Sequence, residues 1–404
     1  MALLMAVHTA VFALLALLVL AYRGTPADAG APEDARLLWI ILGFGLLFRL
    51  TLVPHPAVAS DDIYRYLWDG KVLSHGVNPY AYPPADPHLA PLASGELPAL
   101  VNHPELGSIY PPLAQSFFWL SWTLFGPSQA GLKLLLTLAD AATLLLLVAL
   151  LRRIRKPSLF VILYAWSPLP VLYGSLDGHI DLLGTPLLLL ALLWGLKSRA
   201  FRAALGVAGA ALVKIHPLLI APLLVKVRRN AAGMAAALLA VALFILAWLP
   251  FRDHLPEITR WLSVYGSRWE FNGGLFTVAY WVLGTNESAH SAMNFLLLLW
   301  IIWLIIRHTD WLESVFQAFL GLVVFGPVVH PWYLLWLSAL IVVRWSRAVF
   351  VFLGLSVVSN VVVWRYQSGS GWNDDPLLLL IQYVPLFMLL AVEIAAARPR
   401  RSIA

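Results

Sequence analysis

The chain has 404 residues, of which 61% are hydrophobic and only 12% carry a charge. A soluble globular protein has about 25% charged residues, so this composition excludes a soluble fold and indicates a polytopic membrane protein. There is no cysteine, which excludes disulfides, thiolate metal sites and cysteine nucleophiles. The net charge of +6 comes from short basic clusters between apolar segments, a topology signal that gives no indication of nucleic-acid binding.

Apolar runs long enough to enter or cross a bilayer recur along the whole chain, and we expect a single all-α membrane domain with about 13 membrane segments. Residues 3–22 lack the basic region and the clean cleavage site of a signal peptide, so we interpret them as a retained helix. The predicted segments are 3–22, 37–53, 129–151, 158–174, 182–197, 203–214, 216–226, 231–250, 290–306, 312–327, 333–343, 348–364 and 377–396.

Charge between the segments predicts the orientation in a plasma or inner membrane. Cytoplasmic loops are enriched in Lys and Arg, so we assign the basic clusters to the cytoplasm, with the C-terminus there and the N-terminus outside. The long loops 55–128, 251–289 and 365–376 are then extracytoplasmic, and we expect interfacial helices in the first two. The basic clusters are 152–156, 197–202, 226–229, Arg307, 344–347 and the tail residues Arg398, Arg400 and Arg401.

Segments 203–214 and 216–226 are each too short to span a bilayer, and basic residues flank both. They predict a broken hairpin that turns back at Lys214–Pro217. Non-helical backbone at membrane depth is tolerated only inside protein or beside a wet cavity, so we expect a cavity near Lys214 and His216. An unpaired ammonium there costs about 2.5–3.5 kcal/mol, so Lys214 needs a partner, either a protein carboxylate or a bound phosphate.

Two adjacent aspartates, Asp61 and Asp62, follow the second apolar segment. Ser60 or Asp61 can cap a helix that begins at Ile63, which accounts for one carboxylate. In that helix Asp62 shares a face with Tyr66, four residues on. A carboxylate at the end of a span is well placed to take a proton from a hydroxyl, so Asp62 is predicted as the catalytic base, with Asp61 as the alternative.

The motif DGHIDLLG at 177–184 opens another segment from the outside. Asp177 and Asp181 lie one helical turn apart, and we expect capping together with the binding of substrate hydroxyls. A divalent metal held by these two carboxylates and His179 is the less favoured interpretation, because the spacing of the histidine is wrong for a helical i, i+4 ligand pair.

Three further groups of polar and aromatic residues remain. His330, Trp332 and Tyr333 lie at an outer segment end, and they predict either an aromatic belt or a sugar or phosphate contact. The second large loop supplies cations and stacking surfaces. Charges inside predicted spans favour structural pairing with neighbours. The loop residues include Arg268, Trp269 and Asn272, and the charges within spans are Arg49, Lys133 and Asp140.

Nucleotide-binding motifs are missing from the sequence, so the energy for a reaction is expected to arrive in the substrate. Six motifs in order are similar to those of the C-type (GT-C) integral-membrane glycosyltransferases. Within these, the chain most resembles bacterial enzymes of the family 87 type, which use polyprenyl-phosphate mannose or related lipid-phosphate hexoses. The motifs are SDDIYRYLWDGKVLSHGVNPY, IYPPLAQ, DGHIDLLGTP, LVKIHPLLIAPLL, RWEFNGGLF and HPWYLLWL.

The resemblance implies transfer of a hexose, with inversion, from a polyprenyl-phosphate donor to a lipid or glycan hydroxyl at the outer face. The family pattern D-x-x-[RV]-Y falls on Asp62, Arg65 and Tyr66. It further implies membrane lipids as partners, no nucleic acid, and no cofactor or metal. Tyr110 replaces a basic residue of related members, so Lys214 becomes the better phosphate candidate. The implied donor contacts are Arg65, Tyr66, Tyr110, Lys214, His216, Arg268, Asn272, His330 and Tyr333, and the acceptor or structural residues are His179, Asp181, Trp269 and Trp332.

Two rival functions share part of this pattern. A transporter or flippase of lipid-linked saccharides would predict internal repeats and paired broken helices, whereas we find one broken hairpin and no obvious repeat. A ligase or polymerase that acts on longer undecaprenyl-linked glycans would share the topology and the leaving group.

Overall fold

The structure is a computed structural model that describes residues 1–23 and 34–397. Within these residues, six helices are long and apolar enough to cross a membrane, or up to eight spans if each of two bent pairs counts as one. Further apolar helices of 10–17 residues complete the bundle. The predicted all-α polytopic fold is therefore confirmed, although several predicted segments are too short to be counted as spans by themselves.

The helices follow one another closely along the chain. The loop expected after the first span, over residues 24–33, and the basic tail residues Arg398, Arg400 and Arg401 lie outside the described residues. The α-helices are α1 Ala2–Arg23, α2 Ala35–Leu52, α3 Asp62–Ser74, α4 Pro112–Phe125, α5 Gln129–Arg153, α6 Ile162–Ala165, α7 Asp181–Leu196, α8 Ala200–Ala211, α9 Ala231–Leu246, α10 Leu255–Arg268, α11 Gly274–Leu283, α12 Asn286–Ile306, α13 Trp311–Phe325, α14 Leu335–Val343, α15 Arg347–Leu355, α16 Asn360–Gln367 and α17 Pro376–Ala397. Helical segments of other pitch are Pro87–Leu92, Ser158–Val161, Leu169–Leu176, His216–Lys226, Leu249–His254, Pro331–Leu334 and Ser356–Ser359.

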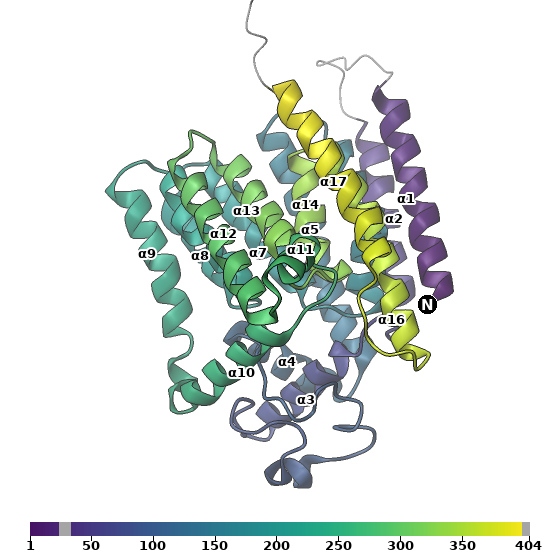
Figure 1. The fold of residues 1–404 in the computed structure, drawn as a ribbon, viewed down its shortest axis with the longest axis vertical. Helices are drawn as coiled ribbons and strands as arrows, with labels where there is room; N and C mark the ends of the chain where they lie inside the picture. Colours follow the sequence, from purple (N-terminus) through teal and green to yellow (C-terminus); the bar gives the residue numbers. More distant parts are fainter. Residues whose placement is uncertain (24–33, 398–404) are drawn as a thin grey trace, which may run out of the picture.

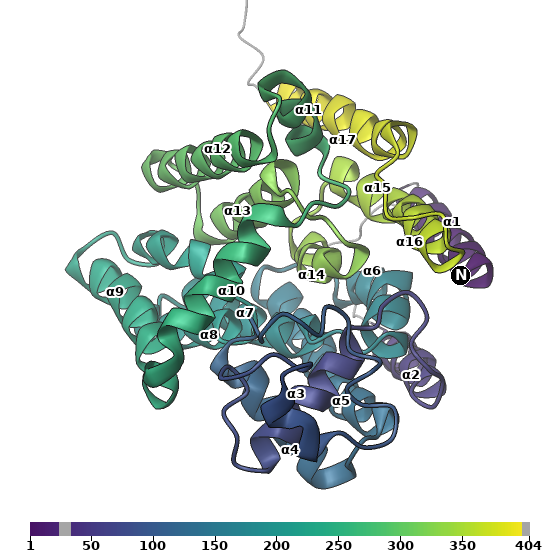
Figure 2. The ribbon, with the colours of Figure 1, turned by 60° about the horizontal axis from the view of Figure 1, so that its bottom comes forward.

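Helices from both large loops lie at one end of the bundle. Helices α3, α4 and α10 lie together at this end (Figure 1), and they face the viewer when that end is turned forward (Figure 2). Helix α4 leaves several large apolar side chains exposed, as a helix in a membrane interface does. These are Trp119, Leu120, Leu124 and Phe125. Both large loops thus contain the helices that the sequence predicts.

The predicted break in the hairpin is present, and a second break was not predicted. Helix α8 ends at Ala211, and the chain continues from His216 to Lys226 as a 3-10 helix. The segment predicted as one span over 158–174 is instead two helical pieces bent by 52°. Pro168 and Pro170 lie at this bend, and proline lacks the N–H that an uninterrupted helix needs.

Helix α7 packs between α5 and α8 in the middle of the bundle. The approach to α8 is close because both helices carry small residues there. A Cβ atom added at Gly206 would lie 2.8 Å from the backbone nitrogen of Ala191. Small residues of this kind let membrane helices gain packing contacts where the hydrophobic effect between them is weak.

The structural pairing predicted for the charges within spans is confirmed. The guanidinium of Arg49 forms an ion pair with Asp140, and both side chains are fully buried. Arg49 also donates to the carbonyl of Ala165 at 2.7 Å, and the Tyr164 hydroxyl donates to Asp140 at 2.6 Å. Lys133 donates to the carbonyl of His55 at 2.7 Å. The bonds of Arg49 and Asp140 tie α2, α5 and α6 together, and the bond of Lys133 ties α5 to the chain that follows α2.

Candidate active site

Asp62 is the first residue of α3, one position earlier than the sequence predicts. The hydroxyl of Ser60 accepts the Asp62 N–H at 3.2 Å, whereas Asp61 makes no capping bond through its side chain. Of the two predicted caps, Ser60 is therefore the one that forms, and Asp61 does not take that role. Both carboxylates are left free for other partners.

Asn102 holds the two aspartates together. Its side-chain nitrogen donates to Asp61 at 2.7 Å and to Asp62 at 3.0 Å. The loop that carries Asn102 is anchored by Arg65, which donates to the carbonyls of Asn102, His103 and Leu106 at 3.0–3.1 Å. Arg65, predicted as a substrate contact, is thus engaged with the protein's own backbone and positions Asn102.

The electrostatic surroundings of Asp62 suit a base. Burial raises its pKa to about 6, and the charges of Asp61 and Asp181 add to the increase, while Asn102 and Lys214 oppose it. Its side chain nevertheless keeps 24% of its surface exposed, so a hydroxyl can still reach it. Asp62 is therefore a carboxylate that binds a proton more readily than an ordinary aspartate and is ionised at neutral pH.

His179 approaches Asp62 from the other side. Its Nδ1 atom lies 3.7 Å from Oδ2 of Asp62, and its ring is fully buried. Burial lowers the pKa of His179 well below its ordinary value, so the imidazole is neutral. The His179 ring is the first of a stack of rings. The ring centre of Trp332 lies 4.1 Å from those of both His179 and His330, and the ring centre of Phe271 lies 4.3 Å from that of His330.

Lys214 has the protein carboxylate that was one of its two predicted partners. Its ammonium lies 2.7 Å from Asp181 and 4.3 Å from the centre of the Tyr333 ring. The indole of Trp336 donates to the other oxygen of Asp181 at 2.6 Å. Trp336 passes so close to Gly184 that a Cβ atom there would overlap its ring, so glycine at that position lets the indole reach Asp181.

The predicted capping role of the DGHID motif is wrong. Helix α7 begins at Asp181 without a side-chain cap, because Asp181 is engaged with Lys214 and Trp336. Asp177 accepts the backbone N–H groups of Val58 and Ala59 at 2.7 and 3.0 Å, and thereby holds the chain that enters α3. Within residues 1–23 and 34–397, no group of three or more metal-ligating side chains is found.

Aromatic side chains complete the site. Tyr66 stacks on Phe118 at 4.7 Å and meets Tyr110 edge-on at 5.1 Å. The hydroxyl of Tyr265, on α10, forms a hydrogen bond with the hydroxyl of Tyr333. In the described part of the chain, buried polar atoms without a hydrogen-bond partner include both ring nitrogens of His179 and Nδ1 of His330. Such atoms are costly unless a ligand satisfies them, and sugar hydroxyls or phosphate oxygens suit them.

Other predicted residues lie around this site without joining it. Arg268 is exposed at the end of α10. Asn272 is buried, and its side chain is bonded to Val329 and Gln382. Trp269 packs edge-on against His103 at 4.9 Å, and His216 packs edge-on against Trp336 at 5.0 Å. Asn102, Tyr265 and Trp336 were not predicted as site residues, and no spacing signal in the sequence marks them.

A family model, that of glycosyltransferase family 87, matches residues 109–274. The protein is a membrane glycosyltransferase. The matched segment of this transferase includes His179, Asp181 and Lys214, whereas Asp61 and Asp62 precede it and His330 follows it. No curated protein matches the chain. The match agrees with the resemblance noted in the sequence over residues 109–274, and the enzyme class is confirmed.

Proposed function

We propose that the transferase moves a hexose, with mannose as the first candidate, from a polyprenyl-phosphate donor to a hydroxyl of a lipid or glycan acceptor. The observation that carries this proposal is the set of contacts around Asp62. A partly exposed carboxylate is held by Asn102 beside His179, and the charges of Lys214 and Asp181 reach it. A base, a cation and unpaired polar atoms are what transfer from a phosphate leaving group requires.

In the proposed reaction the acceptor hydroxyl attacks the anomeric carbon from the face opposite the phosphate. The new bond between the anomeric carbon and the acceptor oxygen forms as the bond to the phosphate oxygen breaks. Asp62 takes the proton of the hydroxyl, and the polyprenyl phosphate leaves with the electron pair. The product has the opposite configuration at the anomeric carbon.

Lys214 is the proposed partner of the leaving phosphate. An ammonium has three donors, and Asp181 takes one of them at 2.7 Å. The remaining donors are available to phosphate oxygens, and a cation there stabilises the charge that develops on them. His330 and Tyr333 are further proposed donor contacts, and His179 and Trp332 are proposed to contact the acceptor.

We propose that the reaction takes place at the extracytoplasmic face of the membrane. Helices α3, α4 and α10 lie at one end of the bundle (Figure 1), and positive-inside topology supports assigning that end to the outside and the C-terminus to the cytoplasm. We propose no metal or other cofactor, since Asp177 is engaged with the backbone of residues 58–59 and no described step needs an additional Lewis acid.

The experiment is an incubation of the purified full-length protein with a panel of labelled polyprenyl-phosphate hexoses and a membrane lipid extract. We expect transfer of label to a lipid or glycan product and release of polyprenyl phosphate. Asp62→Asn should lower this rate by about 10²–10⁴-fold, whereas a flippase would keep most of its activity. Failure of the wild-type protein to consume any such donor contradicts the proposal.

A further inference from the structure

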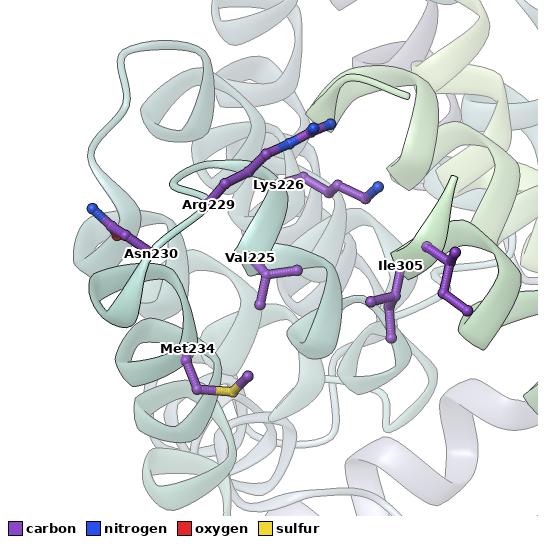
Figure 3. A pocket seen from close by; sticks show the side chains of 7 residues that line it. Val225, Lys226, Arg229, Asn230, Met234 and Ile305 are labelled. Carbon is purple, nitrogen blue, oxygen red and sulfur yellow. The ribbon is translucent and has the colours of Figure 1, made fainter. Parts of the chain in front are cut away.

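A small pocket lies far from Asp62, where the 3-10 helix His216–Lys226 meets the start of α9 and the end of α12. Its volume is about 330 Å³. Because α9 runs away from this point and leads into α10 at its other end, the pocket belongs to the end of the bundle opposite α3 and α10 (Figure 1). The lining residues are Val225, Lys226, Arg229, Asn230, Met234, Ile305 and Ile306 (Figure 3).

Two cations share this pocket without an acidic partner. Lys226 donates to the carbonyl of Arg307, and Arg229 contacts the ring of His308 at 3.1 Å. Across the described ranges 1–23 and 34–397, no carboxylate lies within ion-pair distance of either side chain. Both side chains extend in the same general direction, whereas Asn230 points away (Figure 3). Like charges held together repel, and donors of both groups remain unused.

An apolar stripe begins at the pocket on each flanking helix. On α9 the stripe follows positions i, i+4, i+7 and i+11 from Met234, and on α12 it runs back from Ile306 with comparable spacing, so each stripe occupies one face. The 3-10 helix between them packs against both α9 and α12. The exposed side chains are Met234 (55%), Leu238 (64%), Val241 (36%) and Ile245 (58%) on α9, and Ile306 (73%), Ile302 (42%), Leu299 (44%) and Phe295 (59%) on α12.

We propose that this pocket binds an anionic phospholipid of the membrane leaflet at this end. The phosphate lies between Lys226 and Arg229, and the acyl chains lie along the stripes of α9 and α12. The cations alone would suit any anion, and the stripes alone would suit any lipid, but a phospholipid with net negative charge satisfies both. Arginine binds phosphate through two parallel N–H groups, and basic pockets between membrane helices suit acidic headgroups.

The site is separate from the proposed reaction. The sugar of the donor reacts beside Asp62 at the other end of the bundle, so the lipid bound here is a structural ligand and is not consumed. The inference therefore does not depend on the identity of the donor, and the measurement that tests it is lipid binding, which Asp62→Asn leaves unchanged.

The test is a thermal-unfolding titration of the full-length protein in neutral detergent. Phosphatidylglycerol is compared with phosphatidylcholine of the same acyl chains and with glycerol phosphate, which has no chains. We expect phosphatidylglycerol to raise the Tm more than phosphatidylcholine does, and glycerol phosphate to have little effect. Lys226→Gln/Arg229→Gln should weaken the phosphatidylglycerol effect at least tenfold in midpoint concentration.

The matched control is Arg202→Gln/Arg347→Gln, which removes two positive charges from exposed arginines outside the pocket. It should leave the titration unchanged. Leu238→Asn keeps both cations and is expected to weaken the effect of phosphatidylglycerol through the stripe. The proposal is overturned if the pocket and control variants respond alike, if phosphatidylcholine matches phosphatidylglycerol, or if glycerol phosphate protects as well as the lipid.

Discussion

The side-chain amide of Asn102 lies 3.0 Å from the carboxylate of Asp62, although the two residues are 40 positions apart. The same nitrogen lies 2.7 Å from Asp61. The two N–H groups of one amide thus serve both carboxylates, and as a neutral donor the amide does not neutralise either of them. This arrangement raises distinct expectations for the two acids and for the amide.

Asp62→Asn should lower the rate of transfer by about 10²–10⁴-fold, while Asp61→Asn should retain transfer and extend it to lower pH. The charge of Asp61 helps to raise the pKa of Asp62 to about 6, so its removal lowers that pKa. The base acts in its ionised form, so kcat/KM rises with pH through about 6 and then levels off. In Asp61→Asn the rise should occur at lower pH. Retained activity in Asp62→Asn together with loss of activity in Asp61→Asn would show that Asp61, and not Asp62, is the base.

Asn102→Ala should move the rise of kcat/KM with pH in the opposite direction, to higher pH. The amide stabilises the charged form of Asp62 and thereby lowers its pKa, so its loss raises that pKa and reduces activity at pH 6 more than at pH 8. The measurement is the pH profile of kcat/KM. Glu105→Gln is the control, because Glu105 is exposed on the same loop, and it should leave the profile in place. An unchanged profile in Asn102→Ala would show that the amide does not act on the base.

Variants of Lys214 can distinguish a role in a structural ion pair from a role in binding the donor phosphate. Removal of one partner of a buried pair costs about 3–5 kcal/mol, so Lys214→Met should lower thermal stability and donor turnover together. The double variant Lys214→Met/Asp181→Asn removes the uncompensated carboxylate and should recover stability. If Lys214 binds the phosphate, turnover stays low in the double variant. Recovery of turnover with stability would leave Lys214 only its pairing role.

Gly184 tests whether Trp336 has to reach Asp181. A Cβ atom at Gly184 would overlap the Trp336 ring, so Gly184→Ala should displace the indole, break its bond to Asp181 and lower both the Tm and turnover. Gly43→Ala is the matched control, since Gly43 is also within a helix and a Cβ there meets nothing within 4 Å. It should be neutral or gain up to about 1 kcal/mol from helix propensity. Equal effects of the two variants would contradict the packing argument.

Local features of the site were predictable from the sequence. The spacing of Asp62 and Tyr66 on one helix face needs only the helical period, and the break before His216 needs only the short apolar segments and Pro217. That the charges within spans are paired followed from the cost of an unpaired charge there, whereas the choice of Asp140 as the partner of Arg49 did not. Each of these depends on interactions within a few residues or on the bilayer itself.

Long-range features were not predictable in the same way. Arg65 was predicted to contact substrate, but the fold brings three backbone carbonyls to its guanidinium. Arg268 was chosen on α10, but the helix presents Tyr265, one turn earlier, to Tyr333. A single chain shows which groups are charged or aromatic, but it does not show which loop will fold back against them.

By itself, the physical pattern of the sequence determined that the protein is a helical membrane protein and that Asp62 lies where a span meets the first large loop. Apolar length, charge bias and helical period suffice for this, because the bilayer imposes them on every segment separately. Only the tertiary structure decided that Asn102 joins the two aspartates, that the loop after α3 brings its carbonyls to Arg65, and that Lys214 meets Asp181. These depend on how loops close over helix ends, and many closures are compatible with the same local pattern.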